Sequence, residues 1–171
     1  IDGNQDSTVV KFLNGEDSSS VISGFTIMNG QGRNGGGIHC GNNSSPRIEN
    51  LVITNNVADF GGGIQCFNSS PTIRNVIITG NTAGNDGGGI HCFNASPTLE
   101  NVEITDNLGT WKGGGLGVFS SSDVIAEHVT MNNNSSNSGA GVYCSGSNPT
   151  FTNSILWNSM TDEIHLISGS V

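Results

Sequence analysis

The chain has 171 residues, of which 71 are Gly, Asn or Ser, and only 11% are charged. Its formal net charge of −9 at pH 7 argues against nucleic acid and anionic membrane surfaces as partners, since both repel an acidic protein. No apolar run approaches the length of a membrane-spanning segment, so we expect no membrane insertion. Without periodicity this composition would suggest disorder, and the spacing of the residues therefore decides the fold class.

A repeat of 26 residues runs through the sequence. Glycine triplets begin at Gly35, Gly61, Gly87 and Gly113, and Gly139-Ala140-Gly141 continues the series in step. The cysteines keep the same phase, at Cys40, Cys66, Cys92 and Cys144, with Val118 in the remaining place. A fixed period of this size predicts a solenoid, in which each repeat buries its apolar side only against its neighbours.

The first predicted strand of each turn is a short triplet with a polar or small residue between two apolar ones. In chain order the triplets are Val10-Lys11-Phe12, Ile38-His39-Cys40, Ile64-Gln65-Cys66, Ile90-His91-Cys92, Leu116-Gly117-Val118, Val142-Tyr143-Cys144 and Ile164-His165-Leu166. Such alternation indicates strands with one buried face, and the Gly, Asn and Ser clusters between them indicate turns. Seven triplets predict about seven rungs of a parallel β-helix with three strands per turn.

Two further strands complete each predicted turn, and we expect their apolar residues to point inward. The second is centred on Ile22, Ile48, Ile73, Leu99 and Phe151, and the third contains Phe25/Ile27, Leu51/Ile53, Val76/Ile78, Val102/Ile104 and Val129/Met131. A column of Asn50, Asn75, Asn101 and Asn153, joined by His128, falls at the bend between them. Because Asn tolerates the left-handed conformation and stacked amides can hydrogen-bond, we predict an asparagine ladder there.

The repeats also resemble a known family. They read GGGIHCFNASPTLENVEITDN, GGGIQCFNSSPTIRNVIITGN and GGGIHCGNNSSPRIENLVITNN, with SVISGFTIMNG ahead of them. These runs are similar to the bacterial right-handed parallel β-helix repeats of the pectin-lyase-like superfamily. The resemblance covers essentially the whole chain and implies an all-β, right-handed solenoid in a single domain, residues 1–171. It implies an extracellular or cell-surface protein, but it does not define the function, since this superfamily includes lyases, hydrolases and adhesins.

Catalytic residues known from that superfamily do not map onto this sequence. Its lyases are implied to hold calcium with carboxylates on the outer face of the first sheet, and its polygalacturonases to use clustered aspartates. Here the outward column contains no carboxylate and reads Lys11, His39, Gln65, His91, Gly117, Tyr143 and His165. We therefore predict a non-catalytic scaffold or adhesin-type module. The alternative is part of a polysaccharide lyase or glycoside hydrolase whose catalytic residues lie outside this chain.

The candidate ligand-binding residues are hydrogen-bonding side chains on that outward column, together with one tryptophan expected in a loop. They are Lys11, His39, Gln65, His91, Tyr143 and Trp111. A row of this kind could contact successive units of a glycan, and the alternative is a plain solvent-exposed polar face. The acidic net charge favours a neutral glycan over a polyuronate, unless calcium bridges through Asp59 and Asp86. Those two aspartates, expected in loops one rung apart, equally suit turns.

Several other residue columns have both a structural and a functional interpretation. Phe67, Phe93 and Phe119 suit ring stacking, with sugar binding as the alternative. The thiols occur once per rung with parallel Cβ directions, so we expect free buried cysteines and neither disulfides nor a metal site. Arg74 between Glu49 and Glu100 indicates a solvated charge ladder.

Neither end of the chain carries a recognisable polar cap, at residues 1–9 or 168–171. We therefore expect isolated chains to associate end to end or to be marginally stable. The chain also starts without a signal peptide, in what looks like the middle of a strand and turn, so we expect a fragment of a longer secreted protein. Val52 and Ile77 suggest a lateral protein contact.

Overall fold

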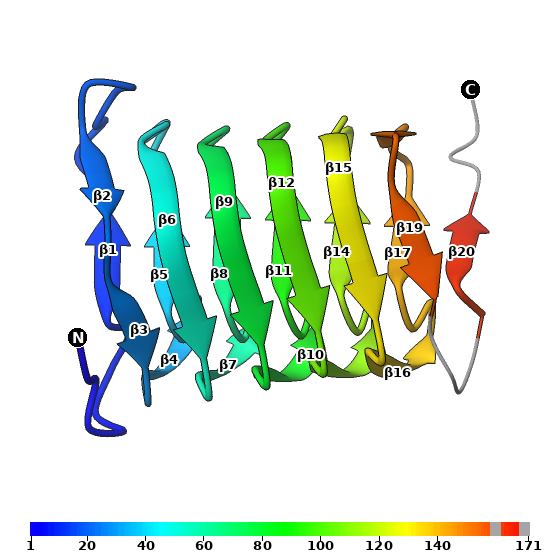
Figure 1. Cartoon of the computed structure of the whole chain (residues 1–171), viewed down its shortest axis with the longest axis horizontal. Helices are drawn as coiled ribbons and strands as arrows, with labels where there is room; N and C mark the ends of the chain where they lie inside the picture. The colour runs from blue at the N-terminus through cyan, green and yellow to red at the C-terminus, as the bar shows by residue number, and fades with distance from the viewer. Residues whose placement is uncertain (158–161, 168–171) are drawn as a thin grey trace.

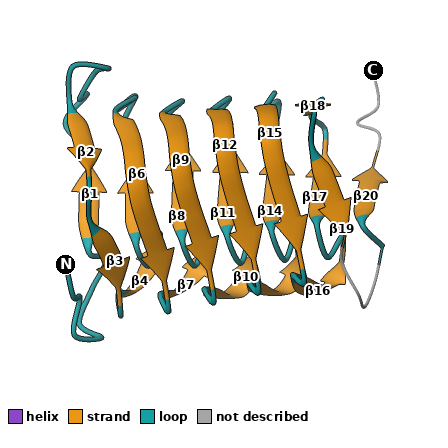
Figure 2. Cartoon of the chain, viewed as in Figure 1, coloured by secondary structure: helices purple, strands orange, loops and turns teal. Residues whose placement is uncertain are grey.

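The structure is a computed structural model that describes residues 1–157 and 162–167. All regular elements in these ranges are β-strands, and no helix in them could span a membrane (Figure 2). The turns lie side by side along one long axis, with Val10–Phe12 near one end and Ile164–Ile167 near the other (Figure 1). About six turns of ~26 residues form a parallel β-solenoid with three sheets. The solenoid and its period are as predicted, and the seven predicted rungs correspond to the seven strands of the first sheet. Residues 168–171, which were expected to lack a cap, lie outside the described residues.

Three sheets run the length of the solenoid. The first contains β1 (Val10–Phe12), β5 (Ile38–Cys40), β8 (Ile64–Phe67), β11 (Ile90–Phe93), β14 (Leu116–Phe119), β17 (Val142–Ser145) and β20 (Ile164–Ile167). The second contains β2 (Val21–Ser23), β3 (Thr26–Met28), β6 (Arg47–Thr54), β9 (Thr72–Thr79), β12 (Thr98–Thr105), β15 (Ile125–Asn132), β18 (Thr150–Thr152) and β19 (Ile155–Trp157). The third contains β4 (Gln31–Asn34), β7 (Val57–Phe60), β10 (Thr82–Asp86), β13 (Leu108–Lys112) and β16 (Ser135–Ser138).

The first sheet confirms the predicted register. Its strands pair in parallel, in the order of the chain, and residues of equal phase lie opposite each other. Cys92, for example, pairs with Cys66 on one side and with Val118 on the other. The 26-residue period is therefore the length of one complete turn, and each column of the sequence is a column of the solenoid.

The second sheet differs from the prediction of two separate strands per turn. In the middle turns both predicted strands belong to one continuous strand, such as β9, which bends near its centre. The bend falls at Asn50, Asn75, Asn101 and His128, where φ lies between 53° and 54°. A single left-handed residue turns the strand without ending its pairing, because the residues on both sides remain hydrogen-bonded to the neighbouring turns.

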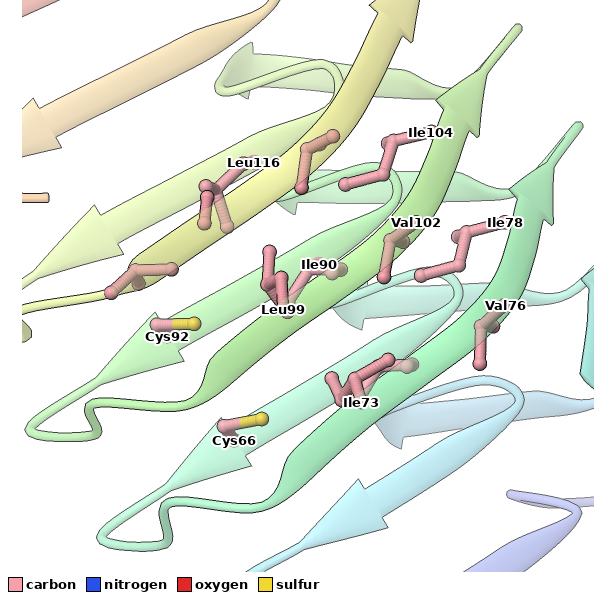
Figure 3. Packing of buried hydrophobic residues seen from close by; sticks show 14 of the residues in the cluster. Cys66, Ile73, Val76, Ile78, Ile90, Cys92, Leu99, Val102, Ile104 and Leu116 are labelled. Atoms are coloured by element: carbon pink, nitrogen blue, oxygen red, sulfur yellow. The ribbon is translucent and has the colours of Figure 1, made fainter. Parts of the chain in front are cut away.

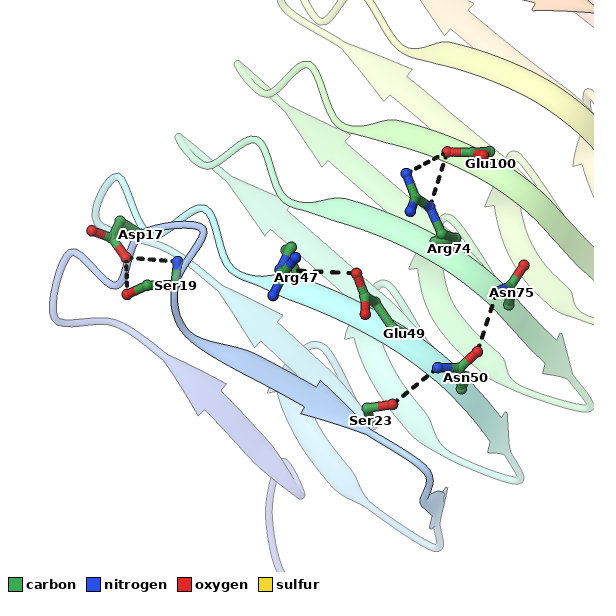
Figure 4. Close-up of polar contacts among 9 residues, drawn as sticks. All are labelled: Asp17, Ser19, Ser23, Arg47, Glu49, Asn50, Arg74, Asn75 and Glu100. Atoms are coloured by element: carbon green, nitrogen blue, oxygen red, sulfur yellow. Dashed lines mark hydrogen bonds and ion pairs between the residues drawn. The ribbon is translucent and has the colours of Figure 1, made fainter.

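The asparagine column at this bend is the predicted ladder, and Figure 4 shows part of it. Asn75 donates from Nδ2 to Oδ1 of Asn50 at 3.2 Å, and Asn101 donates in the same way to Asn75 at 2.8 Å. Asn50 in turn donates to the hydroxyl of Ser23 at 3.1 Å. The ladder is exposed, so each bond competes with water and contributes modestly to stability.

The third sheet corrects the expectation that this part of each turn is a loop. Trp111 lies in β13, Asp59 in β7, and Asp86 at the end of β10. The segment TAGND in β10, for instance, is short and polar, so its sequence lacks the apolar alternation of a strand. It becomes a strand because the turns on either side supply hydrogen-bonding partners at the correct spacing.

The core is one continuous stack of apolar side chains between the sheets (Figure 3). Ile90 is fully buried between Ile64 and Leu116, which are its register partners in the adjacent turns. The expectation that Phe25 is buried is wrong, since it is 49% exposed. Phe25 belongs to the first turn, which has a packed turn on one side only.

A second asparagine ladder, which the sequence analysis missed, is buried where the second sheet turns into the third. Asn56, Asn81 and Asn107 are at most 1% exposed. Asn81 donates from Nδ2 to Asn107 Oδ1 at 3.0 Å and to the Ile53 carbonyl at 2.9 Å. Its own Oδ1 accepts from the backbone N–H of Asn56 at 3.0 Å. These amides satisfy backbone groups that would otherwise be buried without partners.

All four cysteines are free and buried, as predicted. Cys66 and Cys92 point the same way in successive turns (Figure 3), and their hydrogen bond, together with burial, raises the pKa of Cys66. We expect almost no reaction of the native protein with a thiol reagent and four reactive thiols after denaturation without reductant. A count of two or none in the denatured protein, restored to four by prior reduction, would instead reveal disulfides.

Candidate functional site

A cleft of about 560 Å³ lies on the outer face of the first sheet and is hereafter called the cleft. Its floor is made by outward side chains of the first-sheet strands, including His39, Gln65 and His91. Its volume falls in the range typical of small-molecule and cofactor sites. The sequence analysis proposed these three residues as ligand-binding candidates, and the structure brings them together.

One wall of the cleft follows from the alternation of the first-sheet strands. In β8 and β11 the residue two places after the floor residue also points outward, so Phe67 stands beside Gln65, and Phe93 beside His91. The two phenyl rings stack at 5.4 Å between centroids with an interplanar angle of 12°. They remain 42% and 38% exposed, so they present an apolar surface to the cleft.

The opposite wall comes from the ends of the third-sheet strands. Phe60, Asp86 and Lys112 each precede the first glycine of a triplet. At Gly87 φ is 69°, and a Cβ there would meet the carbonyl oxygen of Ile90 at 2.5 Å. Only glycine fits this tight left-handed corner, which turns the chain from the third sheet into the first. The corner places the preceding side chain over the outward column.

Two of the floor residues are buried, which contradicts the alternative of a plain solvent-exposed polar face at these positions. Gln65 is 3% exposed and His91 is 5% exposed. The ring of His91 lies between those of Phe60 and Phe119, at centroid distances of 5.3 and 5.1 Å. Tyr143 is also buried, because its ring packs on Phe119 at 5.4 Å. Aromatic residues from other columns therefore cover His91 and Tyr143 of the predicted row.

The Phe119 ring does not continue the stack of Phe67 and Phe93, and the reason lies in its own turn. The outward position of its own turn is Gly117, which offers no side chain, and the Phe119 ring fills that space. Its Cε2 atom lies 2.9 Å from the place that a Cβ would take on Gly117. Lys112 adds its cation over the rings of Tyr143 and Phe119, with Nζ at 5.0 and 5.9 Å from their centroids. This aromatic cluster forms one end of the cleft.

Burial controls the charge state of the floor. It lowers the pKa of His91 to about 4, so this imidazole is neutral at pH 7. Burial, and to a smaller extent the Lys11 cation, also lowers the pKa of His39. A neutral imidazole has one donor and one acceptor nitrogen, which suits recognition of hydroxyl groups.

Gln65 carries a buried acceptor atom that has no partner. Its Nε2 lies 3.5 Å from His91 Nδ1, whereas its Oε1 makes no hydrogen bond although it is buried. A buried amide oxygen without a partner costs free energy, and such atoms are uncommon in native structures. Gln65 Oε1 is therefore an acceptor without a partner in a residue that lines the cleft.

The remaining candidates lie at the edges of the cleft. Trp111 is 58% exposed and borders a smaller hollow of about 300 Å³, which shares Phe60, Asp86 and Lys112 with the cleft. Lys11 is exposed and pairs in register with His39. Asn34, Phe60 and Lys112 were missed, although the residue before each glycine triplet recurs with the same 26-residue period and could have been read as a column. Arg33, which also lines the cleft, was missed as well.

The structure does not align Asp59 with Asp86 as a pair. Asp86 pairs in register with Phe60, and burial raises the pKa of its carboxyl, against the lowering influence of the Lys112 cation. Asp59, the neighbour of Phe60 in β7, is exposed and does not line the cleft. Within residues 1–157 and 162–167 no group of three or more His, Cys, Asp or Glu residues could hold a metal ion.

Charged residues on the second sheet form solvated pairs away from the cleft (Figure 4). Arg74 contacts Glu100 at 2.8 Å, and both side chains are more than two-fifths exposed. Arg47 lies 3.9 Å from Glu49. Exposed pairs of this kind contribute little stability, which agrees with the interpretation of a charge ladder.

Comparisons with known proteins agree with this architecture. Residues 11–171, nearly the whole chain, match a family model described as a right-handed beta helix region. No curated protein and no solved structure matches the chain.

Proposed function

Because this chain belongs to the right-handed β-helix family, we propose that it is a non-catalytic scaffold module that binds a neutral glycan in the cleft. Membership of a fold family does not define a function, so the proposal depends on the site itself. The observation that carries it is the pairing of a buried polar floor with an exposed apolar wall. Sugars combine hydroxyl groups with apolar C–H faces, and the cleft offers partners for both.

The apolar partner is the stacked pair of Phe67 and Phe93, which is large enough to contact the face of a sugar ring. The polar partners are Gln65 and the neutral imidazoles of His39 and His91. Trp111, beside the cleft, provides a second exposed aromatic face for a longer chain. Together these residues support binding of an extended ligand and not only of a single sugar.

The charges in the cleft support a non-catalytic role. Asp86 is the only carboxylate among the described residues that line it. Glycoside hydrolases generally use two carboxylates that flank the scissile bond. A hydrolase activity of this kind would therefore need a second carboxylate from outside the cleft. The basic lining residues Arg33 and Lys112 are partly offset by Asp86, which is compatible with a neutral ligand.

The finer assignment is also a proposal. We infer from the resemblance of the repeats that the chain is a bacterial member of the pectin-lyase-like superfamily and is extracellular or exposed at the cell surface. The end turns expose Trp157 and Leu166, and the second sheet exposes Ile77, which supports end-to-end and lateral protein contacts.

A glycan array tests the proposed ligand. Wild type should bind neutral glycans, and Phe67→Ala should bind them about tenfold more weakly, because the stacking surface is lost. Ile77→Ala is the matched control: Ile77 is 40% exposed, close to the 42% of Phe67, but it lies on the second sheet. Absence of binding by wild type, or equal binding by wild type and Phe67→Ala, contradicts a glycan site in the cleft.

A further inference from the structure

One position in the phenylalanine wall lacks a side chain. Gly41 follows Cys40 just as Phe67 follows Cys66 and Phe93 follows Cys92, and these three cysteines lie in one column. The stack of rings therefore ends at Phe67. In the preceding turn the same place belongs to Leu13, which follows Phe12, the register partner of Cys40. We call the space between Leu13 and Phe67 the Gly41 slot.

The Gly41 slot has one apolar side chain on each side. Leu13 directly follows β1, and Phe67 lies on β8, two strands away, where neighbouring strands are spaced by about 4.8 Å. The Leu13 side chain reaches toward Gly41, since its Cδ2 lies 2.9 Å from the place that a Cβ would take on Gly41. Phe93 covers one face of the Phe67 ring, and the opposite face is turned toward Gly41. On the other side of the slot, Asn42 stabilises the backbone at Leu13 by donating from Nδ2 to the Leu13 carbonyl at 2.9 Å.

Two polar atoms in the floor of the cleft belong to residues next to the Gly41 slot. Gln65, the outward neighbour of Phe67 on β8, holds the buried Oε1 that has no hydrogen-bond partner. His39 stands in the same turn as Gly41, and its Nε2 lies 3.3 Å from the place that a Cβ would take on Gly41. Both residues line the same cleft as Leu13, Gly41 and Phe67. The slot therefore combines two apolar walls with an acceptor that needs a donor.

We propose that the Gly41 slot is the anchoring subsite of the cleft and holds one pyranose ring of the glycan. The C–H faces of the ring contact Phe67 and Leu13, and a hydroxyl at its edge donates to Gln65 Oε1. His39 Nε2 is placed for a second hydroxyl. This inference rests on the proposed function and adds a rule for which sugars bind. A ring without a hydroxyl donor at that edge leaves Gln65 Oε1 unpartnered and is rejected.

Gly41→Phe is the direct test, because it places in the slot the side chain that the next two turns already carry. The φ of Gly41 lies outside the left-handed range, so a side chain is compatible with its backbone. Leu13 Cδ2, 2.9 Å from the new Cβ position, must move aside, and it is the end of a flexible side chain. The matched control is Ser145→Phe, in register with Phe119 but outside the cleft.

We expect Gly41→Phe to lose at least tenfold in affinity for the glycan that wild type selects on the array, while Ser145→Phe retains wild-type affinity. Calorimetry measures the affinities, and thermal melts show whether each variant is folded. If Gly41→Phe binds as well as wild type, the slot is not the subsite, although the cleft still binds glycan. If wild type binds no glycan, both the proposed function and this inference fail.

A second variant keeps the test independent of any packing defect at Gly41. Gln65→Met preserves the length of the side chain and removes the unpartnered acceptor. We expect its affinity to fall about tenfold while its melting temperature stays equal or rises, since a buried unsatisfied atom is lost. A merely structural role for Gln65 predicts the reverse, a lower melting temperature with unchanged affinity, and that result would overturn the role of Gln65 in the subsite.

Discussion

Ile90→Asp should lower the free energy of unfolding by about 3–5 kcal/mol, because it buries a charge that has no partner. Ile90 is fully buried, and its register partners Ile64 and Leu116 offer only apolar atoms. In a solenoid the damage is not confined to one turn, since each turn buries its apolar side only against its neighbours. Urea denaturation followed by circular dichroism measures the change.

Ile77→Asp is the matched control for this substitution. It makes the same chemical change on an outward position of the second sheet that is 40% exposed, so its cost should stay within about 1 kcal/mol. His91→Asp should also be destabilising although His91 points outward, because its ring is enclosed by Phe60 and Phe119. Equal stability of Ile90→Asp and Ile77→Asp would disprove the inward and outward assignment.

The free energy of unfolding should fall by about 3 kcal/mol as the pH drops from 6.5 to 4, owing to His91 alone. Burial lowers the pKa of His91 from 6.5 to about 4 in the folded protein. Between these two values the unfolded chain binds a proton at this imidazole and the folded chain does not, so acid favours unfolding. Above pH 6.5 both states are neutral and the effect disappears.

His91→Gln isolates this contribution, since Gln65 already occupies the equivalent place in the adjacent turn. The difference in free energy of unfolding between wild type and His91→Gln should change with pH only between about 4 and 6.5. Glu16 titrates lower, because hydrogen bonds from Ser44 and from the backbone of Asn14 lower its pKa to about 2. A difference that is constant with pH would show that His91 is not buried as a neutral group.

The successes of the sequence analysis follow from the fixed period. In a parallel solenoid one repeat forms one turn, so equal phase along the chain becomes register between strands, as at Cys66 and Cys92. The alternation in Ile90-His91-Cys92 then separates inward from outward residues, and an asparagine at a fixed phase marks a left-handed bend. Each of these properties depends on local sequence and spacing alone.

The third sheet illustrates what spacing alone does not reveal. The segment Thr82–Asp86 lacks apolar alternation, and it is extended because the neighbouring turns bond its backbone. The sequence analysis missed the buried amide ladder of Asn56, Asn81 and Asn107 for the same reason. The sequence around an asparagine in a turn does not show whether its side chain faces water or the carbonyl groups of the neighbouring turns.

The sequence by itself determined the solenoid, its register and the outward column that contains His39, Gln65 and His91. Only the tertiary structure decided that this column is the floor of a cleft and not an open face. The physical reason is that burial of an outward side chain depends on what another sheet places over it. Here Phe60 and Lys112 arrive from the third sheet, and Phe119 moves into the space left at Gly117. Gly41 contributes no side chain to the Gly41 slot, and Leu13 Cδ2 and His39 Nε2 lie 2.9 and 3.3 Å from the place that a Cβ would take there.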